Sequence, residues 1–164
     1  MLSKILELQD VIKVVRDLRR SKKKVVFTNG CFDILHVGHV RYLASARSQG
    51  DVLVVGLNSD ESVRSIKPKN RPIVNQHQRA EVLAGLECVN YITVFDEPDP
   101  LKIIKALKPD VLVKGADWIE EKIIGADIVK ANGGKVVRVS VVPEVSTSQI
   151  IQRIVRLYQR GYGE

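Results

Sequence analysis

The stretch KVVFTNGCFDILHVGH, residues 24–39, decides the fold of this chain. Residues 24–28 form a short aliphatic and β-branched run, which is typical of a buried strand. The run ends at Asn29-Gly30, a turn signal, and a helical pattern is expected from about His39 to Ser48, with Gly50 as its stop. The stretch therefore predicts one strand–turn–helix unit of an α/β protein.

Helix and strand patterns alternate along the rest of the chain. We expect an amphipathic helix over residues 2–20, strands over 51–57, 91–95, 111–114 and 135–142, and helices over 75–86, 98–107, 120–132 and 146–159. Five aliphatic strands separated by helices predict an α/β fold with a doubly wound, five-stranded parallel sheet. Residues 1–22 are expected to form an added N-terminal helix, and residues 23–160 a single domain.

Composition narrows the class of protein. The 164 residues carry a formal charge of +7, which fits either a protein that binds nucleic acid or an anionic surface, or one with a pocket for polyanionic small molecules. The basic residues are dispersed, so we predict no nucleic-acid partner. Two cysteines, Cys31 and Cys88, make no disulfide framework, and the opening MLSKILELQD is neither a signal peptide nor a membrane span. We predict a cytoplasmic protein with no membrane partner.

The two histidines that follow the first strand suit phosphate chemistry. Gly30 permits a tight turn, and Gly38 lets His36 and His39 lie near each other where a helix opens. The unpaired N–H groups of a helix N-terminus favour phosphate, and imidazole N–H groups can stabilise the charge that develops on phosphorus. The alternatives are a metal site or two surface histidines. Zinc is disfavoured because no further ligand falls at zinc-site spacing.

Three other segments are expected at the same edge of the sheet. Lys67, Lys69 and Arg71 lie in a loop that prolines stiffen, which could clamp a phosphate or could be a solvated basic loop. Asp117 follows Gly115 after a buried strand, where glycine allows close approach of a base or ribose and the carboxylate can accept a hydrogen bond. The neighbouring Trp118 could equally be a packing residue.

The last helix opens with consecutive hydroxyls, at Ser146, Thr147 and Ser148. One hydroxyl would cap the helix, and three indicate anion binding. Glu144, just before them, is expected to point outward or to meet a lysine. Residues 58–60 are expected to be either a helix cap or part of the site, and Arg79 either to reach a phosphate or to lie on the surface.

The run GCFDILHVGH, residues 30–39, resembles the signature of the HxGH nucleotidyltransferases, a superfamily that includes cytidylyltransferases, phosphopantetheine adenylyltransferase and class I aminoacyl-tRNA synthetases. Within it, the chain is similar to the heptose 1-phosphate adenylyltransferases of lipopolysaccharide synthesis over roughly residues 24–155. That similarity includes LNSDESVRSIK at 57–67, RPI at 71–73, RAEVLAGL at 79–86, PDVLVKGADW at 109–118 and VSTSQII at 145–151.

The resemblance implies a Rossmann-like adenylyltransferase that moves AMP from ATP to D-glycero-β-D-manno-heptose 1-phosphate, with Mg²⁺ bridging the phosphates and no protein metal ligand. The chain departs from the family pattern at Pro68 and Glu144, where relatives usually have glycine. The alternatives are a glycerol-3-phosphate cytidylyltransferase, an FMN adenylyltransferase, or a non-catalytic nucleic-acid-binding module. By analogy the chain could form a homodimer. The implied catalytic residues are His36, His39 and Lys67; the nucleotide-binding residues are Gly30, Cys31, Phe32, Gly38, Lys69, Gly115, Asp117, Ser146, Thr147 and Ser148; and the acceptor-binding residues are Lys67 and Arg71.

Overall fold

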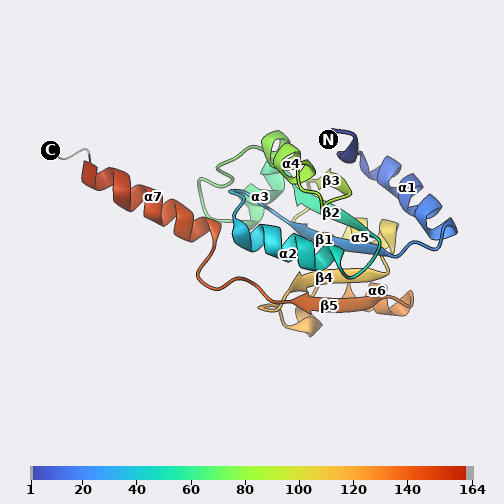
Figure 1. Ribbon diagram of the computed structural model, residues 1–164. Coiled ribbons are helices and arrows are strands. Elements are labelled where there is room, and N and C mark those ends of the chain that lie inside the picture. Colours follow the sequence, from blue (N-terminus) through green and yellow to red (C-terminus); the bar gives the residue numbers. More distant parts are fainter. Residues whose placement is uncertain (1, 162–164) are drawn as a thin grey trace.

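The aliphatic runs pair into one five-stranded parallel sheet in the computed structural model, which describes residues 2–161 (Figure 1). The strands are β1 (Val25–Gly30), β2 (Val52–Asn58), β3 (Tyr91–Phe95), β4 (Val111–Gly115) and β5 (Lys135–Val139). Their order is β3-β2-β1-β4-β5, and every neighbouring pair is parallel. The strand order reverses between β1 and β4, which makes this junction the topological switch point. The predicted fold class is confirmed.

Helices cover both faces of the sheet. The α-helices are α1 (Leu8–Arg20), α2 (Val37–Arg47), α3 (Asp60–Ile66), α4 (Gln76–Ala84), α5 (Leu101–Leu107), α6 (Ala126–Ala131) and α7 (Thr147–Gly161), with short 3₁₀ helices η1 (Leu2–Lys4) and η2 (Glu120–Lys122). One buried cluster joins α2 and α4 to the sheet, and a second joins α1, α5 and α6 to the opposite face. We call these the α2 face and the α5 face.

Alternating strand residues build these two clusters. Val26 and Val113 belong to the α2 face, whereas Phe27 and Leu112 belong to the α5 face. Successive side chains of a strand point to opposite sides of a sheet, so a central strand needs apolar residues throughout. The valines, leucines and isoleucines that dominate both clusters satisfy this requirement with few aromatic residues.

Three element predictions need correction. The N-terminal helix begins at Leu8 and not at residue 2, because the Leu6 N–H donates to the Ile92 carbonyl (2.9 Å) and this segment lies against β3. The predicted helix over 120–132 is divided into η2 and α6 by Gly125, whose φ of 82° is left-handed. Helix α3 was missed; the Ser59 hydroxyl caps it by accepting a hydrogen bond from the Ser62 N–H (3.1 Å).

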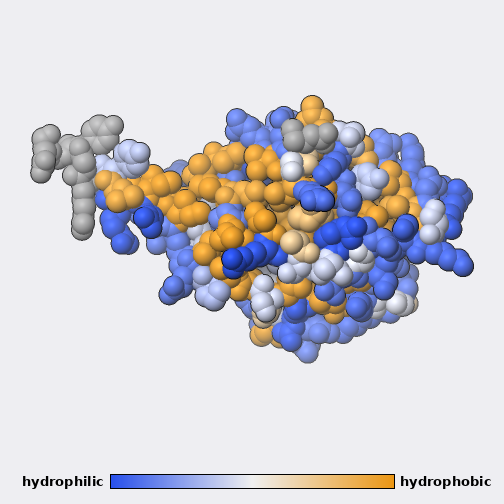
Figure 2. Space-filling view, viewed as in Figure 1, coloured by the Kyte–Doolittle hydropathy of each residue, from blue (hydrophilic) through white to orange (hydrophobic). Residues whose placement is uncertain are grey.

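Helix α7 extends away from the sheet and its covering helices (Figure 1). It is amphipathic, and its apolar residues Ile154, Val155, Leu157 and Tyr158 are between 45% and 64% exposed. Figure 2 shows hydrophobic surface along this helix and onto the body of the protein. None of the helices within residues 2–161 is long and apolar enough to cross a membrane.

Candidate active site

A cleft of about 580 Å³ opens at the carboxyl ends of the strands. Its walls come from the loop after β1, the first turns of α2 and α7, the end of α3 and the segment that follows β4. This is the place that the strand order assigns to a ligand, because the carboxyl ends of β1 and β4 diverge at the switch point. Residues far apart in the chain therefore share one concave site.

The two histidines lie in this cleft with their rings stacked. The ring centroids of His36 and His39 are 3.7 Å apart with an interplanar angle of 20°, and the Phe32 ring meets His39 edge-on at 5.2 Å. Burial lowers the pKa of His36; it also lowers the pKa of His39 to about 4, with the neighbouring His36 adding to the effect. Both imidazoles are therefore neutral at pH 7, and each has one N–H to donate.

The local backbone explains why these rings can stack. His36 is the extended N-cap of α2, with φ −141° and ψ 170°, and no side chain caps this helix start. A Cβ added at Gly38 would lie 3.0 Å from His36 Nδ1, so a larger residue there would require the ring to shift from its place over the first turn. The Nδ1 atoms of His36 and His39 are buried without a hydrogen-bond partner among the described residues. Unpaired polar atoms at a helix start are suited to a polar ligand.

The loop after β1 is fixed by a buried carboxylate. Asp33 accepts hydrogen bonds from Arg71 Nε (2.5 Å) and from the backbone N–H groups of Ile73 (2.9 Å) and Val74 (2.8 Å). Burial alone would raise the pKa of Asp33, but the hydrogen bonds from Val74, Ile73 and Arg71 together lower it. The Asp33 carboxylate thus ties the loop before α4 to the histidine segment.

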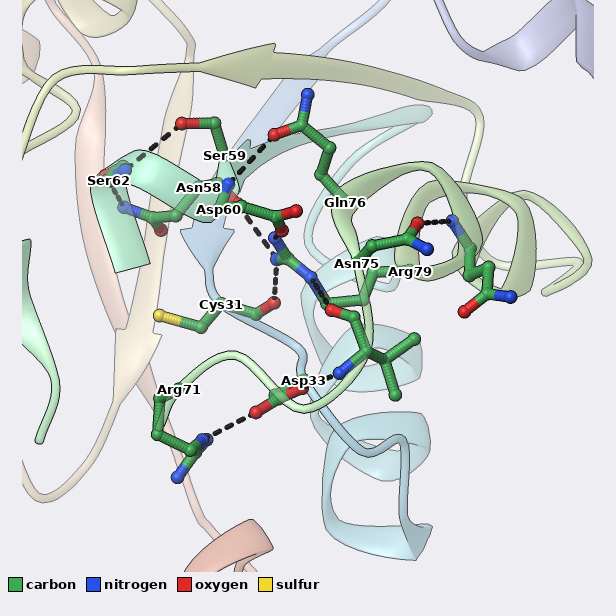
Figure 3. Close-up of polar contacts among 12 residues, drawn as sticks. Cys31, Asp33, Asn58, Ser59, Asp60, Ser62, Arg71, Asn75, Gln76 and Arg79 are labelled. Carbon is green, nitrogen blue, oxygen red and sulfur yellow. Dashed lines mark hydrogen bonds and ion pairs between the residues drawn. The ribbon is translucent and has the colours of Figure 1, made fainter. Parts of the chain in front are cut away.

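Arg79 makes a second set of hydrogen bonds that hold these segments together, and its position corrects an expectation. It was expected either to reach a phosphate or to lie on the surface, but it is 1% exposed. Its guanidinium donates to the carbonyls of Cys31 (2.5 Å), Asn58 (2.8 Å) and Val74 (2.9 Å) and pairs with Asp60 at 2.8 Å (Figure 3). Arg79 therefore joins the ends of β1 and β2 to α3 and α4 from inside the protein.

The start of α7 contributes the hydroxyl wall. Ser146 Oγ accepts a hydrogen bond from the Gln149 N–H (3.2 Å), which is a helix cap, and Thr147 is buried. Ser146, Thr147 and Ser148 all line the cleft. Glu144 is exposed to solvent with φ 56°, in agreement with the expectation that it faces outward.

The sequence of this cleft matches a known family. A family model described as cytidylyltransferase-like matches residues 27–153. This chain belongs to the cytidylyltransferase-like family. The match confirms the superfamily predicted from the HxGH run and the enzyme class, nucleotidyltransferase.

The curated relatives that this cytidylyltransferase-like chain matches are longer than the chain itself. The bifunctional protein HldE of Syntrophotalea carbinolica is 51% identical over 154 residues, which is 94% of this chain and 31% of that protein. The bifunctional protein HldE of Geobacter metallireducens is 49% identical over 156 residues, which is 95% of this chain and 32% of that protein. The chain thus spans about a third of the length of these relatives.

Two solved structures share the fold of this cytidylyltransferase-like chain. The lipopolysaccharide core biosynthesis protein of Thermoplasma volcanium superposes with a TM-score of 0.61 at 29% identity, covering 73% of this chain and 97% of its own. A pantoate-beta-alanine ligase of Francisella tularensis superposes with a TM-score of 0.58 at 18% identity, covering 93% and 78%. The second likeness concerns the fold alone.

The cleft of the cytidylyltransferase-like domain gathers most, but not all, of the predicted site residues. Lys69 and Arg71 are not among the residues that line it, whereas Lys67 lines it from an exposed position at the C-cap of α3. The predicted residues that line the cleft are Gly30, Cys31, Phe32, His36, Gly38, His39, Lys67, Gly115, Asp117, Ser146, Thr147 and Ser148.

Sequence reasoning missed two polar residues on the cleft floor. Lys114 is the last residue but one of the buried strand β4 and is 8% exposed, and its ammonium group hydrogen-bonds to the Asn29 side-chain oxygen near the end of β1. The ammonium also lies 5.7 Å from the centroid of the Trp118 ring, within the range of a cation–π contact. The signal available in the sequence was a lysine inside an otherwise aliphatic strand, which is unusual for a residue type that is rarely buried.

Proposed function

We propose that this chain transfers AMP from ATP to D-glycero-β-D-manno-heptose 1-phosphate and forms ADP-heptose and pyrophosphate. The observation that carries the proposal is the stacked, neutral pair His36 and His39, which lines the same cleft as the hydroxyl-rich start of α7. The heptose acceptor is supported by the similarity to the bifunctional HldE proteins and to the lipopolysaccharide core biosynthesis protein.

The reaction needs positioning and charge stabilisation more than acid–base chemistry. An oxygen of the acceptor phosphate attacks the α-phosphorus of ATP, a new P–O bond forms, and the bond from the α-phosphorus to the bridging oxygen of pyrophosphate breaks. The attacking phosphate is already an anion at neutral pH, so no general base is required. Catalysis then rests on holding two polyanions in line and stabilising the charge on the α-phosphate of the transferred adenylyl group.

Each wall of the cleft has a part in this chemistry. The N–H groups of His36 and His39 would donate to the α-phosphate oxygens as these gain charge in the transition state. The N-terminus of α7, with its hydroxyls, would hold the leaving pyrophosphate, since a helix start favours anions. Lys67 at the rim would neutralise phosphate charge, and the roles of Lys69 and Arg71 stay predictions from the sequence.

Magnesium is assigned to the substrate and not to the protein. Within residues 2–161, no group of three or more His, Cys, Asp or Glu side chains is placed to hold a metal ion. Of the lining carboxylates, Asp33 is occupied by Arg71 and two backbone N–H groups. We propose that Mg²⁺ accompanies the triphosphate, as is usual for a cation that takes phosphate oxygens as ligands.

The test is an acceptor screen. Purified protein with ATP and Mg²⁺ should release pyrophosphate with the heptose 1-phosphate and not with glycerol 3-phosphate or FMN. CTP in place of ATP tests the nucleotide. Release of pyrophosphate only with glycerol 3-phosphate and CTP, or only with FMN, would replace this proposal with the corresponding transferase. Absence of pyrophosphate with every sugar 1-phosphate would refute it.

We further propose that the chain forms a homodimer through α7. The support is the exposed apolar side of that helix, with Ile154 at 46% and Leu157 at 60% exposure, which a second copy could cover. The cytoplasmic location and the lack of a nucleic-acid partner stay predictions from the sequence.

A further inference from the structure

The cleft reaches both faces of the sheet, and its two sides differ in character. Tyr42 of α2 hydrogen-bonds to Thr28 (2.7 Å) and to the Val113 carbonyl (3.1 Å), so Thr28 points to the α2 face. Side chains alternate along a strand, so Asn29, which follows Thr28, and Lys114, which follows Val113, point to the α5 face. The Cβ that a side chain would have at Gly56 lies 3.3 Å from Asn29 Cβ and 2.9 Å from Phe27 Cζ, which confirms that Asn29 shares the side of Phe27.

Lys114 is a buried cation without a carboxylate partner within residues 2–161. Its contacts within the described residues are the Asn29 oxygen and the face of Trp118. No salt bridge to Lys114 is present in this part of the chain, although seven other ion pairs are. A buried ammonium group is destabilising unless an anion or several acceptors meet it. Lys114 also lines the cleft, so a bound ligand can reach it.

A purely structural role does not account for this pair. Asn29 and Lys114 do join β1 to β4, but two apolar side chains would do so without removing a charge from water. None of the three carboxylates that line the cleft supplies the missing anion. Asp33 is bound to Arg71 and Asp99 accepts a hydrogen bond from the Leu101 N–H (2.9 Å). Asp117 also lines the cleft, and it forms no ion pair with Lys114.

We propose that Lys114, oriented by Asn29, binds the phosphate of the acceptor sugar 1-phosphate on the α5 side of the cleft. This assignment rests on the proposed function and adds the place from which the acceptor attacks. Lys114 is a binding residue that keeps its proton, and Asn29 is a positioning residue that acts through it. Trp118 beside the ammonium offers an apolar surface to the sugar ring.

The in-line geometry of the reaction indicates which of the two substrates Lys114 binds, the acceptor or the nucleotide. The attacking and leaving oxygens lie on opposite sides of the α-phosphorus. The start of α7, proposed to hold the leaving pyrophosphate, lies on the α2 side: the Thr147 hydroxyl is 3.5 Å from the Ile34 carbonyl, and Val142 lies next to Gly38. The attacking phosphate therefore belongs on the other side, where Lys114 lies.

The experiment compares Lys114→Met with the control Lys105→Met, which replaces an exposed lysine of α5 that does not line the cleft. Steady-state pyrophosphate release is measured with ATP and the heptose 1-phosphate, each varied in turn. We expect Lys114→Met to raise KM for the acceptor about 10- to 100-fold, as for the loss of a charge-assisted hydrogen bond, and to change KM for ATP by less than about twofold. Asn29→Ala should raise the same KM by a smaller factor, and Lys105→Met should change neither.

A second measurement needs no variant to fold. In wild-type protein with ¹³C-labelled lysine, the Cε signal of Lys114 should shift on titration with the heptose 1-phosphate and not with an ATP analogue that cannot be cleaved. An unchanged acceptor KM in Lys114→Met, or a signal that responds to the nucleotide alone, overturns this assignment and leaves the proposed function intact. A wild-type protein that releases no pyrophosphate with any sugar 1-phosphate overturns both.

Discussion

Replacing Arg79 by methionine should destabilise the protein strongly, although Arg79 does not line the cleft. Its guanidinium is fully buried and donates hydrogen bonds to three backbone carbonyls and to the Asp60 carboxylate (Figure 3). Methionine matches the unbranched arginine stem as far as Nε, so the change removes the head of the guanidinium together with its hydrogen bonds and keeps the apolar packing of the stem. The effect therefore measures the polar network that holds the loop after β1.

The magnitude follows from what is left without a partner. A buried carbonyl that loses its donor costs about 1 kcal/mol or more, and removing one partner of a buried ion pair costs about 3–5 kcal/mol. The carboxylate of Asp60 keeps 21% exposure, so water can take over part of the ion pair. Because the four groups relax together, their contributions do not simply add, and we expect a total of about 4 kcal/mol. That is a large share of the roughly 5–15 kcal/mol by which a domain is stable.

Urea unfolding followed by circular dichroism measures this loss. The matched control is Arg64→Met, an exposed arginine of α3, which should change the free energy of unfolding by less than about 0.5 kcal/mol. A loss below about 1 kcal/mol in Arg79→Met would refute the reasoning, because it would mean that the four contacts are replaced at little cost.

Three further changes test the site and the assembly. His36→Ala should lower the rate of pyrophosphate release about 10²- to 10³-fold, and an unchanged rate would remove His36 from the site. The pKa of His39 falls from 6.5 to about 4 on folding, so between these pH values the unfolded chain binds more protons than the folded one. The free energy of unfolding should therefore fall by about 1–2 kcal/mol as the pH drops from 6.5 to 4, and it should fall by less in His39→Asn. Leu157→Glu should convert the proposed dimer to a monomer in light scattering, whereas Gln152→Glu on the same helix should not; a monomeric wild type would contradict the dimer.

The sheet could be predicted from the sequence because its strands are buried on both faces. Continuous aliphatic runs such as residues 52–57 have few other interpretations, and the helices between them imply parallel pairing. The errors fall where tertiary contacts override a local pattern. The Leu6 N–H donates to the Ile92 carbonyl of β3, a contact that no local rule can foresee. Helix α3 has only seven residues, too few for a clear period.

The site was predictable to the extent that its chemistry lies in loops. Glycines, histidines and hydroxyls at strand ends are informative because a fold alone rarely requires them there. Arg71 shows the limit of this reasoning. A cation in a loop suggested phosphate binding, which stays a prediction, and no local pattern showed that its Nε donates to Asp33, a residue 38 positions away in the chain. Which charges the fold pairs with one another is a property of the structure.

A comparison of Arg79 with Lys114 shows how the fold compensates a buried charge. Both are basic residues that the fold buries, at 1% and 8% exposure. The guanidinium of Arg79 meets four acceptors, one of them a carboxylate, so its charge is compensated within the protein. The ammonium of Lys114 has one neutral hydrogen-bond acceptor and an aromatic face, and burial lowers its pKa to about 8. A buried charge must be compensated from somewhere; for Arg79 the protein supplies the partner, and for Lys114 the substrate phosphate is the partner that would complete the site.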